Sequence, residues 1–177
     1  VPAPGNPFPG SSVWATGLWN TFGMDFDLET GYLFATENGP TCDDEINLII
    51  PGQNYGWNGN ISCDDPPGIR QAAGLPPLIS WTPTISPTSL IIYHGDAFPE
   101  WQGDLFFCTF NNIKMYRVIL NEQRTRFASD PMEVPVPNRD VSCSIEIAQS
   151  PEGYIYYSTV AGIYRLVPAT PATDEGG

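Results

Sequence analysis

Short runs of β-forming residues recur along the chain, and no stretch of about 10–15 residues has the apolar periodicity of an amphipathic helix. The abundant Pro (19) and Gly (17) residues lie between these runs and predict tight turns. One such turn is Asp27–Gly31, and another is Ser150–Gly153. The pattern therefore predicts an all-β fold of short antiparallel strands.

The runs form three sets that repeat about every 40–60 residues, which is typical of β-propeller blades. We expect blades at about 13–57, 78–134 and 140–167, the last without an outer strand. Periodicity alone does not separate a propeller segment from a β-sandwich. The expected strands are Val13–Thr16, Met24–Asp27, Tyr32–Glu37 and Glu45–Ile49; then Ser89–Tyr93, Asp104–Phe110, Met115–Leu120 and Phe127–Val134; then Ser144–Ala148, Tyr154–Thr159 and Ile163–Val167.

The two ends of the chain differ in composition from the middle. Residues 1–12 are too rich in Pro for a central strand, and residues 168–177 have the composition of a flexible tail. The chain begins at Val1 and shows no secretion signal, so we interpret it as a processed or excised segment. No run of about 18 apolar residues is present, and no membrane span is expected.

The charge and the cysteines limit the partners and the compartment. A net charge of −13 repels phosphate backbones, so a nucleic acid is not expected as a partner. Such a surface either is simply solvated or binds cations. Four Cys without a CxxC motif indicate two disulfides in an extracellular or periplasmic protein, with three pairings open. Asn60 begins an Asn-Ile-Ser glycosylation sequon, which matters only in a source that glycosylates.

A series of motifs resembles the soluble PQQ-dependent glucose/sorbosone (aldose sugar) dehydrogenases, in order and with similar gaps, over about residues 6–167. The resemblance implies a six-bladed β-propeller of four-stranded antiparallel sheets, of which this chain would supply half, about three blades. The motifs are Gly17-Leu18-Trp19-Asn20, Gly23–Asp27, Glu37-Asn38-Gly39-Pro40, Asp43–Ile49, Asn54-Tyr55-Gly56-Trp57, Trp81–Pro87, Gly95–Phe106, Tyr116-Arg117 and Ser150–Gly153.

In that family PQQ and Ca²⁺ lie on top of the propeller, and a His on an earlier blade acts as the general base. The blade that carries this base is absent here, and His94, the one His of this chain, falls in the His94–Trp101 run, where the family has no catalytic residue, so we expect no catalytic residue in this chain. The carboxylates of PQQ need cations, and Asn20 is the retained cofactor-binding side chain. Arg139 is near but displaced by an insertion, so PQQ binding by this chain alone is not expected. The family's cationic positions hold Trp19, Asn111, Cys143 and Ile145 here.

The resemblance also implies two Ca²⁺ sites. Gly39 and Pro40 match the backbone carbonyls that bind the cofactor Ca²⁺, although Gly-Pro also simply forms a turn. A structural Ca²⁺ would use the carbonyls of Ile61 and Cys63 and the carboxylate of Asp65, with Asp64 as an alternative to Asp65 and a solvated acidic loop as the alternative to a site. We expect the acidic run Asp43, Asp44 and Glu45 to cap turns and bond loop backbone instead of binding metal.

In such a propeller two cysteine pairs come close. Cys42 and Cys63 lie in loops on the same face, and Cys108 and Cys143 would join neighbouring blades. Free buried thiols are the alternative.

Three functions follow from these observations. The first is a secreted, non-catalytic propeller fragment that assembles with itself or docks to a complementary propeller half, because a ring fragment exposes sheet edges and blade flanks. The second is a fragment of a PQQ- and Ca²⁺-dependent aldose sugar dehydrogenase. The third is a propeller that binds a protein or glycan. The first is favoured, and it predicts that the chain is not a stable lone monomer.

Overall fold

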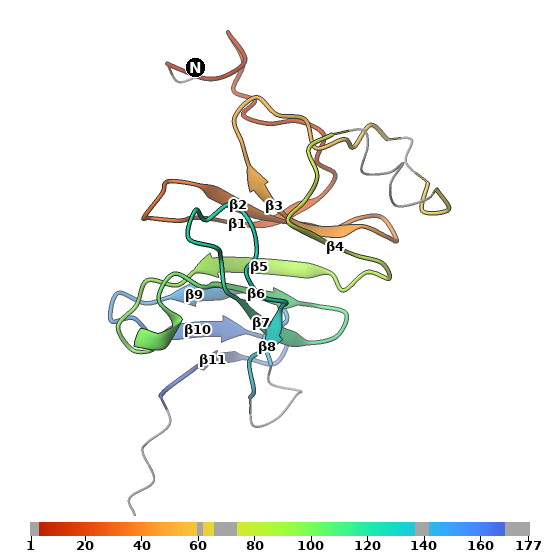
Figure 1. The fold of residues 1–177 in the computed structure, drawn as a ribbon. Helices are drawn as coiled ribbons and strands as arrows, with labels where there is room; N and C mark the ends of the chain where they lie inside the picture. The colour runs from red at the N-terminus through yellow and green to blue at the C-terminus, as the bar shows by residue number, and fades with distance from the viewer. Residues whose placement is uncertain (1–3, 60–61, 66–73, 137–141, 169–177) are drawn as a thin grey trace, which may run out of the picture.

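The computed structural model describes residues 4–59, 62–65, 74–136 and 142–168. In this part of the chain the regular structure consists of three antiparallel sheets and one 3-10 turn at Pro99–Trp101. The sheets stack as three successive layers, with the N-terminal segment beyond the first and β11 at the far side of the third (Figure 1). The all-β expectation is confirmed.

The first sheet has the order β1-β2-β3-β4 and differs in part from the expected strands. We expected Val13–Thr16 to begin it, but Thr16 forms only an isolated parallel bridge with Asn54. Ile79–Trp81 pairs with the third strand instead and supplies the outer strand. Three residues beyond a long polar loop carry too weak a pattern to predict a strand. The strands are β1 (Thr21–Phe26), β2 (Leu33–Glu37), β3 (Asp44–Ile49) and β4 (Ile79–Trp81).

The second and third sheets follow the expected sets. The third sheet has three strands in the described part of the chain, where the other two sheets have four, and β11 is the strand at its outer edge. The second sheet contains β5 (Pro87–Ile92), β6 (Leu105–Thr109), β7 (Lys114–Val118) and β8 (Met132–Glu133), and the third contains β9 (Ile147–Gln149), β10 (Ile155–Ser158) and β11 (Ile163–Arg165).

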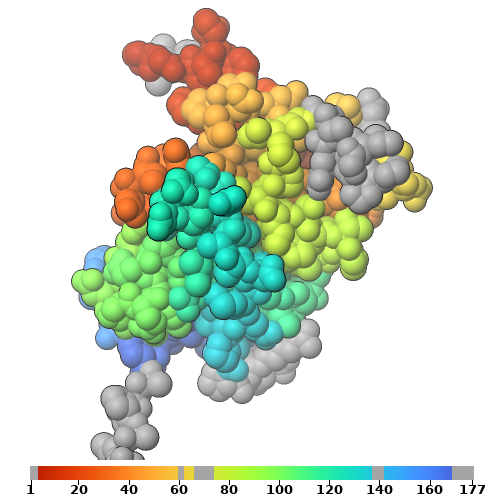
Figure 2. Space-filling model, in the orientation of Figure 1, coloured from red at the N-terminus to blue at the C-terminus, as the bar shows by residue number. Residues whose placement is uncertain are grey.

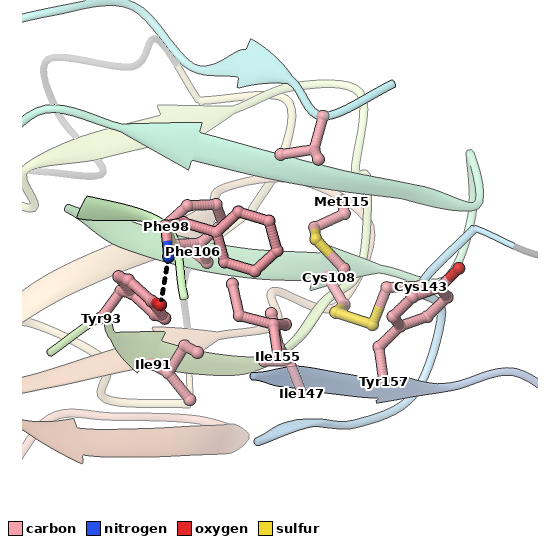
Figure 3. Packing of buried hydrophobic residues seen from close by; sticks show 11 residues of the cluster. Ile91, Tyr93, Phe98, Phe106, Cys108, Met115, Cys143, Ile147, Ile155 and Tyr157 are labelled. Carbon is pink, nitrogen blue, oxygen red and sulfur yellow. Dashed lines mark hydrogen bonds between the residues drawn. A yellow bond between two sulfur atoms is a disulfide. The ribbon is translucent and has the colours of Figure 1, made fainter. Parts of the chain in front are cut away.

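The sheets pack face to face through two apolar layers. Between the first and second sheets the layer is built around Phe34, Ile46, Leu90 and Phe107, all at most 2% exposed. Between the second and third it includes Tyr93, Phe106, Met115, Ile147 and Ile155, together with a disulfide (Figure 3).

The first strand of each sheet lies innermost, because β1 contacts β5 and β5 contacts β9. This close approach requires a residue without a side chain. A Cβ on Gly23 of β1 would lie 2.5 Å from the carbonyl oxygen of Thr88 in β5. Sheets that share an axis in this way form consecutive blades of a β-propeller.

A buried ion pair ties the first two blades together at their outer loops. Arg124 Nε, from the segment between β7 and β8, donates to Asp27 Oδ2 at 2.9 Å. Asp27 follows β1, and its side chain is fully buried. In the space-filling view the β7–β8 segment lies against the β1–β2 turn (Figure 2).

Candidate ligand-binding site

A hollow of about 540 Å³ lies where the three blades meet at one end of the inner strands. It is lined from the start of β1, the end of β2, the start of β5, the end of β6 and the segment before β9. Every blade therefore contributes to it. The lining residues are Asn20, Phe22, Asn38, Gly39, Ser86, Thr88, Phe110, Ser144 and Ile145.

The buried carboxylate of Asp44 organises one wall of this hollow. Its Oδ1 accepts a hydrogen bond from Gly39 N at 2.9 Å, and its Oδ2 accepts from Ile85 N and Ser86 N, both at 2.6 Å. Burial raises the pKa of Asp44 even though these three donors lower it. Asp44 therefore bonds loop backbone, as the sequence predicted.

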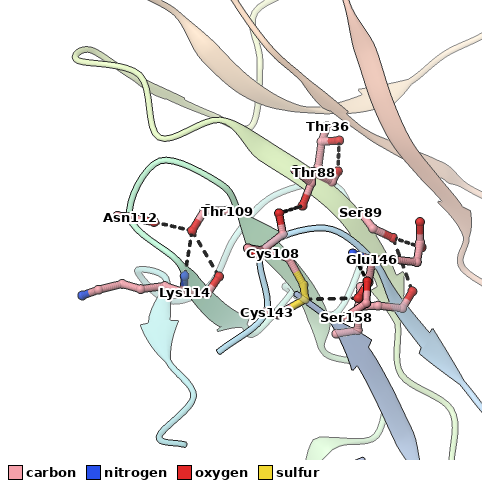
Figure 4. The surroundings of a disulfide bond; sticks show 12 residues. Thr36, Thr88, Ser89, Cys108, Thr109, Asn112, Lys114, Cys143, Glu146 and Ser158 are labelled. Atoms are coloured by element: carbon pink, nitrogen blue, oxygen red, sulfur yellow. Dashed lines mark hydrogen bonds between the residues drawn. A yellow bond between two sulfur atoms is a disulfide. The ribbon is translucent and has the colours of Figure 1, made fainter. Parts of the chain in front are cut away.

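Hydroxyl groups and a disulfide tie the blades together beneath the hollow (Figure 4). Thr36 Oγ1 of the first blade donates to the carbonyl of Thr88, and Thr88 Oγ1 donates to the carbonyl of Ser144 at 3.4 Å. The disulfide joins Cys108 of β6 to Cys143, with a Cα–Cα distance of 5.2 Å. These links run from the first blade to the third and set the shape of the hollow.

The lining is uncharged and partly aromatic. Phe22 and Phe110 are 58% and 52% exposed, so their rings are open to a ligand. Asn38 Oδ1 is buried and has no hydrogen-bond partner in the described part of the chain. Amides, hydroxyls and apolar rings suit a ligand with hydroxyl groups and no net charge.

The predicted cofactor residues are only partly brought together. Asn20 and Gly39 line the hollow beside Ile145, one of the positions that replaces a family cation. Pro40 and Trp19 line a separate pocket, which shares Gly39 with the hollow. Asn111 lies beyond the lining, and its Nδ2 donates to the carbonyl of Thr84 at 3.2 Å.

The structural Ca²⁺ site was predicted at Ile61, Cys63 and Asp65. Ile61 lies outside the described residues, as does the sequon residue Asn60. Cys63 is joined to Cys42 in a disulfide with an S–S distance of 2.00 Å. Asp65 Oδ2 accepts a hydrogen bond from Ser62 N at 3.4 Å. Among the described residues no group of three or more His, Cys, Asp or Glu side chains is arranged to hold a metal.

His94 lies away from the hollow, after β5. Its Nε2 is 3.5 Å from Asp27 Oδ1 and accepts a hydrogen bond from Leu28 N at 3.4 Å. These contacts hold the β1–β2 turn against the second blade, which is a structural role.

Several lining residues were not predicted. Asn38 stands inside a recognised motif, but the motif does not reveal that this residue lines a hollow. Phe22 and Phe110 gave a usable signal, since each is an apolar residue at the end of a strand. Ser86, Thr88 and Ser144 gave none, because only the packing of β5 against β9 brings these small polar residues together.

The fold and the hollow define the class of this protein. Consecutive antiparallel sheets around a common axis, with a hollow at the ends of their inner strands, form a segment of a β-propeller. A family model described as glucose/sorbosone dehydrogenase matches residues 1–166. The chain belongs to this glucose/sorbosone dehydrogenase family.

Individual relatives agree with this assignment. An uncharacterized protein of Synechocystis is 34% identical over 87% of this chain and 38% of its own length. The aldose sugar dehydrogenase YliI of Escherichia coli is 24% identical over 91% of this chain and 44% of its own length. The chain thus spans about four-tenths of the length of these curated relatives.

A solved structure supports the fold. The PQQ-bound form of aldose sugar dehydrogenase from Streptomyces coelicolor is 26% identical, with a TM-score of 0.67, over 88% of this chain and 42% of that one. The matched chain is again more than twice as long as the matched region.

The cofactor of that relative does not match the donor set of the hollow. PQQ carries carboxylates, which need cationic partners. None of the residues that line the hollow is charged. Within the described part of this chain, the hollow therefore does not fit a polyanionic quinone.

Two further observations concern the compartment. Both disulfides have the pairing that the resemblance implied, and disulfides are typical of oxidising compartments. In the described residues no helix has the length and apolar character needed to cross a bilayer.

Proposed function

We propose that this chain forms three blades of a sugar-dehydrogenase-like propeller whose central hollow binds an uncharged, hydroxyl-rich molecule such as an aldose. These residues do not carry out quinone-dependent oxidation. One observation carries the proposal, namely the uncharged lining of the hollow. The positions at which the family has cationic side chains hold neutral residues here, and one of them, Cys143, forms a disulfide with Cys108.

The proposed ligand follows from the groups that face the hollow. The side chains of Asn20, Ser86 and Ser144 line the hollow, and their amide and hydroxyl groups can hydrogen-bond ligand hydroxyls. Phe22 and Phe110 offer exposed ring faces for the C–H face of a sugar. An anionic ligand would meet no positive partner here, and a net charge of −13 would repel it.

The test compares ligand binding with catalysis. We expect titration calorimetry to show saturable binding of an aldose, with an affinity about tenfold lower in Phe110→Ala. Ile163→Ala in β11 is the control, because it also removes an exposed apolar side chain but lies on the third blade, away from the hollow. Equilibrium dialysis with PQQ and Ca²⁺ should show no retained cofactor. Glucose-dependent dye reduction at about 1–1000 turnovers per second would overturn the proposal.

A second proposed function is docking through the first blade, and its outer face supports this. Met24 and Phe26 of β1 are 63% and 55% exposed. An apolar groove of about 210 Å³ runs beside them, lined in part by Trp14, Leu18 and Leu33. The occupant we propose is the complementary set of blades, because the chain spans less than half the length of its relatives. Without those blades, two copies would bury these faces against each other.

Sedimentation tests this second proposal. The chain should form dimers or larger species at micromolar concentration and bury at least about 1,000 Å² per contact. Met24→Asp should shift it to monomer, whereas Met132→Asp, at another exposed Met on β8, should not. A monomer whose unfolding is cooperative and independent of concentration would refute it.

The disulfides also support a place for this protein outside the cytosol, in the periplasm or the extracellular space. Fractionation of the source cells tests this part of the proposal. Recovery of the protein with reduced cysteines from the cytosol would contradict it.

A further inference from the structure

A second, smaller pocket, with a volume of about 50 Å³, shares Gly39 with the hollow. A single water needs about 10–15 Å³ of such space, so the pocket admits a group larger than water. Its walls combine carboxylates with aromatic rings. The lining residues are Gly17, Trp19, Glu37, Gly39, Pro40, Cys42, Asp43, Glu45, Tyr55, Trp57, Leu75 and Pro77.

Two of the carboxylates belong to directly paired residues of neighbouring strands. Glu37 of β2 is the register partner of Glu45 in β3. Like charges in this arrangement destabilise a sheet. No described Lys, Arg or His forms an ion pair with either residue. The pair therefore carries negative charge that this part of the chain does not compensate.

The two carboxylates differ in how many hydrogen bonds they accept. The Glu37 carboxylate accepts three hydrogen bonds from residues before and at the start of β1. The donors are Trp19 N, Asn20 N at 2.6 Å and Thr21 Oγ1 at 2.7 Å. Glu45 accepts one hydrogen bond, from Asn47 Nδ2 to Oε2 at 3.1 Å. Its other oxygen lacks a donor in the described part of the chain and is free to bind a ligand.

The electrostatics of Glu45 agree with this geometry. The pKa of Glu45 is raised to about 7, chiefly by burial; the Asn47 hydrogen bond lowers it, and the neighbouring carboxylates of Glu37, Asp43 and Asp44 raise it. A cation placed beside Glu45 would lower this pKa, because an opposite charge favours the carboxylate form.

The aromatic side of the pocket is preformed. The rings of Trp19 and Trp57 lie 4.6 Å apart at an angle of 53°. Glu37 holds the backbone of Trp19, and Trp57 N donates to the carbonyl of Gly17 at 2.9 Å. Tyr55 is held from both sides, since its hydroxyl donates to Leu48 O and accepts from Ile50 N. Indole faces attract organic cations.

We propose that this pocket binds a primary alkylammonium ion, such as a lysine side chain or a small amine. The three N–H donors of the ammonium group can reach the free oxygen of Glu45, and the alkyl chain can lie along Trp19 and Trp57. A quaternary ammonium has no donor for Glu45. A bare metal ion would not use the rings, and no described group of three or more metal-ligating side chains is present.

The test uses n-butylamine as the probe, with 1-butanol as its neutral counterpart. Titration at pH 8, followed by NMR of the indole N–H signals and by calorimetry, should show saturable one-to-one binding of the amine only. Glu45→Gln should lower the affinity at least tenfold, whereas Glu122→Gln, which removes the same charge from an exposed loop position, should leave it unchanged. The affinity should also fall between pH 8 and pH 6, because Glu45 gains a proton over that range.

A second variant keeps the proposal falsifiable if Glu45→Gln disturbs the pocket. Trp19→Arg places a tethered guanidinium beside the two carboxylates, so it should raise the melting temperature and block butylamine binding. The proposal fails if butylamine does not saturate, if 1-butanol binds equally well, or if either variant binds the amine like the wild type. It also fails if CaCl₂ displaces butylamine at equal concentration, because the pocket would then be an inorganic cation site.

Discussion

Glu37 of β2 and Glu45 of β3 stand directly opposite each other in register, on the face of the first blade that points away from the second. Strand alternation puts them there, since their neighbours Thr36 and Ile46 point into the interface between the blades. The arrangement concentrates negative charge beside Trp19 and Trp57, and it makes the stability of the fold sensitive to pH.

The first prediction concerns Glu45. Its pKa is raised from an ordinary 4.5 to about 7, so the folded protein favours the uncharged acid. Stability is then lost as the pH rises from about 4.5 through 7, and the loss is complete above 7. Glu45→Gln should increase the free energy of unfolding at pH 8 by about 1–3 kcal/mol and change it little at pH 4. Urea unfolding at the two pH values measures this, and an equal effect at both would contradict it.

The second prediction concerns the ion pair between Asp27 and Arg124. Burial by itself would raise the pKa of Asp27, but hydrogen bonds from Thr30, Arg124 and the Glu29 backbone lower it below its ordinary value. The pair therefore stabilises the fold above about pH 4, and this contribution is lost as the pH falls through the folded pKa. Asp27→Asn should cost about 3–5 kcal/mol at pH 7, because it leaves the Arg124 guanidinium buried without its partner.

The control for this ion pair lies in the same turn. Glu29→Gln changes an exposed carboxylate two residues away and should cost less than about 0.5 kcal/mol in the same urea titration. Similar losses of unfolding free energy in the two variants would show that the stability depends on the turn in general and not on the ion pair between Asp27 and Arg124. Near pH 3 the difference between Asp27→Asn and the wild type should shrink.

The third prediction concerns the disulfide between Cys108 and Cys143, which links the second and third blades across 35 residues. Replacing both cysteines with Ala should lower the free energy of unfolding by about 3–4 kcal/mol, since the unfolded chain regains the entropy of an open loop. Urea unfolding of this variant and of the wild type, both without reductant so that Cys42–Cys63 stays closed, gives the size of the effect. Peptide mapping without reduction should recover Cys42–Cys63 and Cys108–Cys143, and any other pairing would disprove the assignment.

The fourth prediction concerns Gly23, where β1 approaches β5. A Cβ here would lie 2.5 Å from Thr88 O and 2.7 Å from Ser89 Cα, and neither backbone atom can move without separating the blades. Gly23→Ala should therefore cost about 1–3 kcal/mol. Gly162→Ala is the matched control, because its nearest contact is the Tyr164 hydroxyl at 3.5 Å. Equal stability of the two variants in chemical unfolding would refute the argument.

Most strands were predictable because their pattern is local. Tyr32–Glu37 and Met115–Leu120 alternate or run apolar between turn residues, and the structure contains β2 and β7 there. The outer strand of the first blade was missed for the opposite reason. Ile79–Trp81 becomes a strand only by pairing with β3, 30 or more residues earlier in the chain. Val13–Thr16 has suitable residues but forms only an isolated parallel bridge, from Thr16 to Asn54.

The candidate sites were predictable only in part. The motif from Glu37 to Pro40 was recognised, and Asn20 and Gly39 do meet at the hollow. The hydroxyl and aromatic lining of the hollow was not predicted, because Phe110 and Ser144 come from different blades and only packing brings them together. The pairing of Glu37 with Glu45 also escaped notice, because a register between strands is set by the turn and the packed face together.

The sequence by itself determined the class of the fold, the number of strand sets, the absence of positive charge at the expected cofactor positions and the supply of cysteines. These properties depend on residue type and local spacing. The tertiary structure alone decided which residues meet: the Asp27–Arg124 pair, the uncharged hollow at the inner strands, and the two carboxylates facing each other beside Trp19 and Trp57. Such contacts join residues from 8 to 97 positions apart in the chain, and only packing around the common axis specifies them.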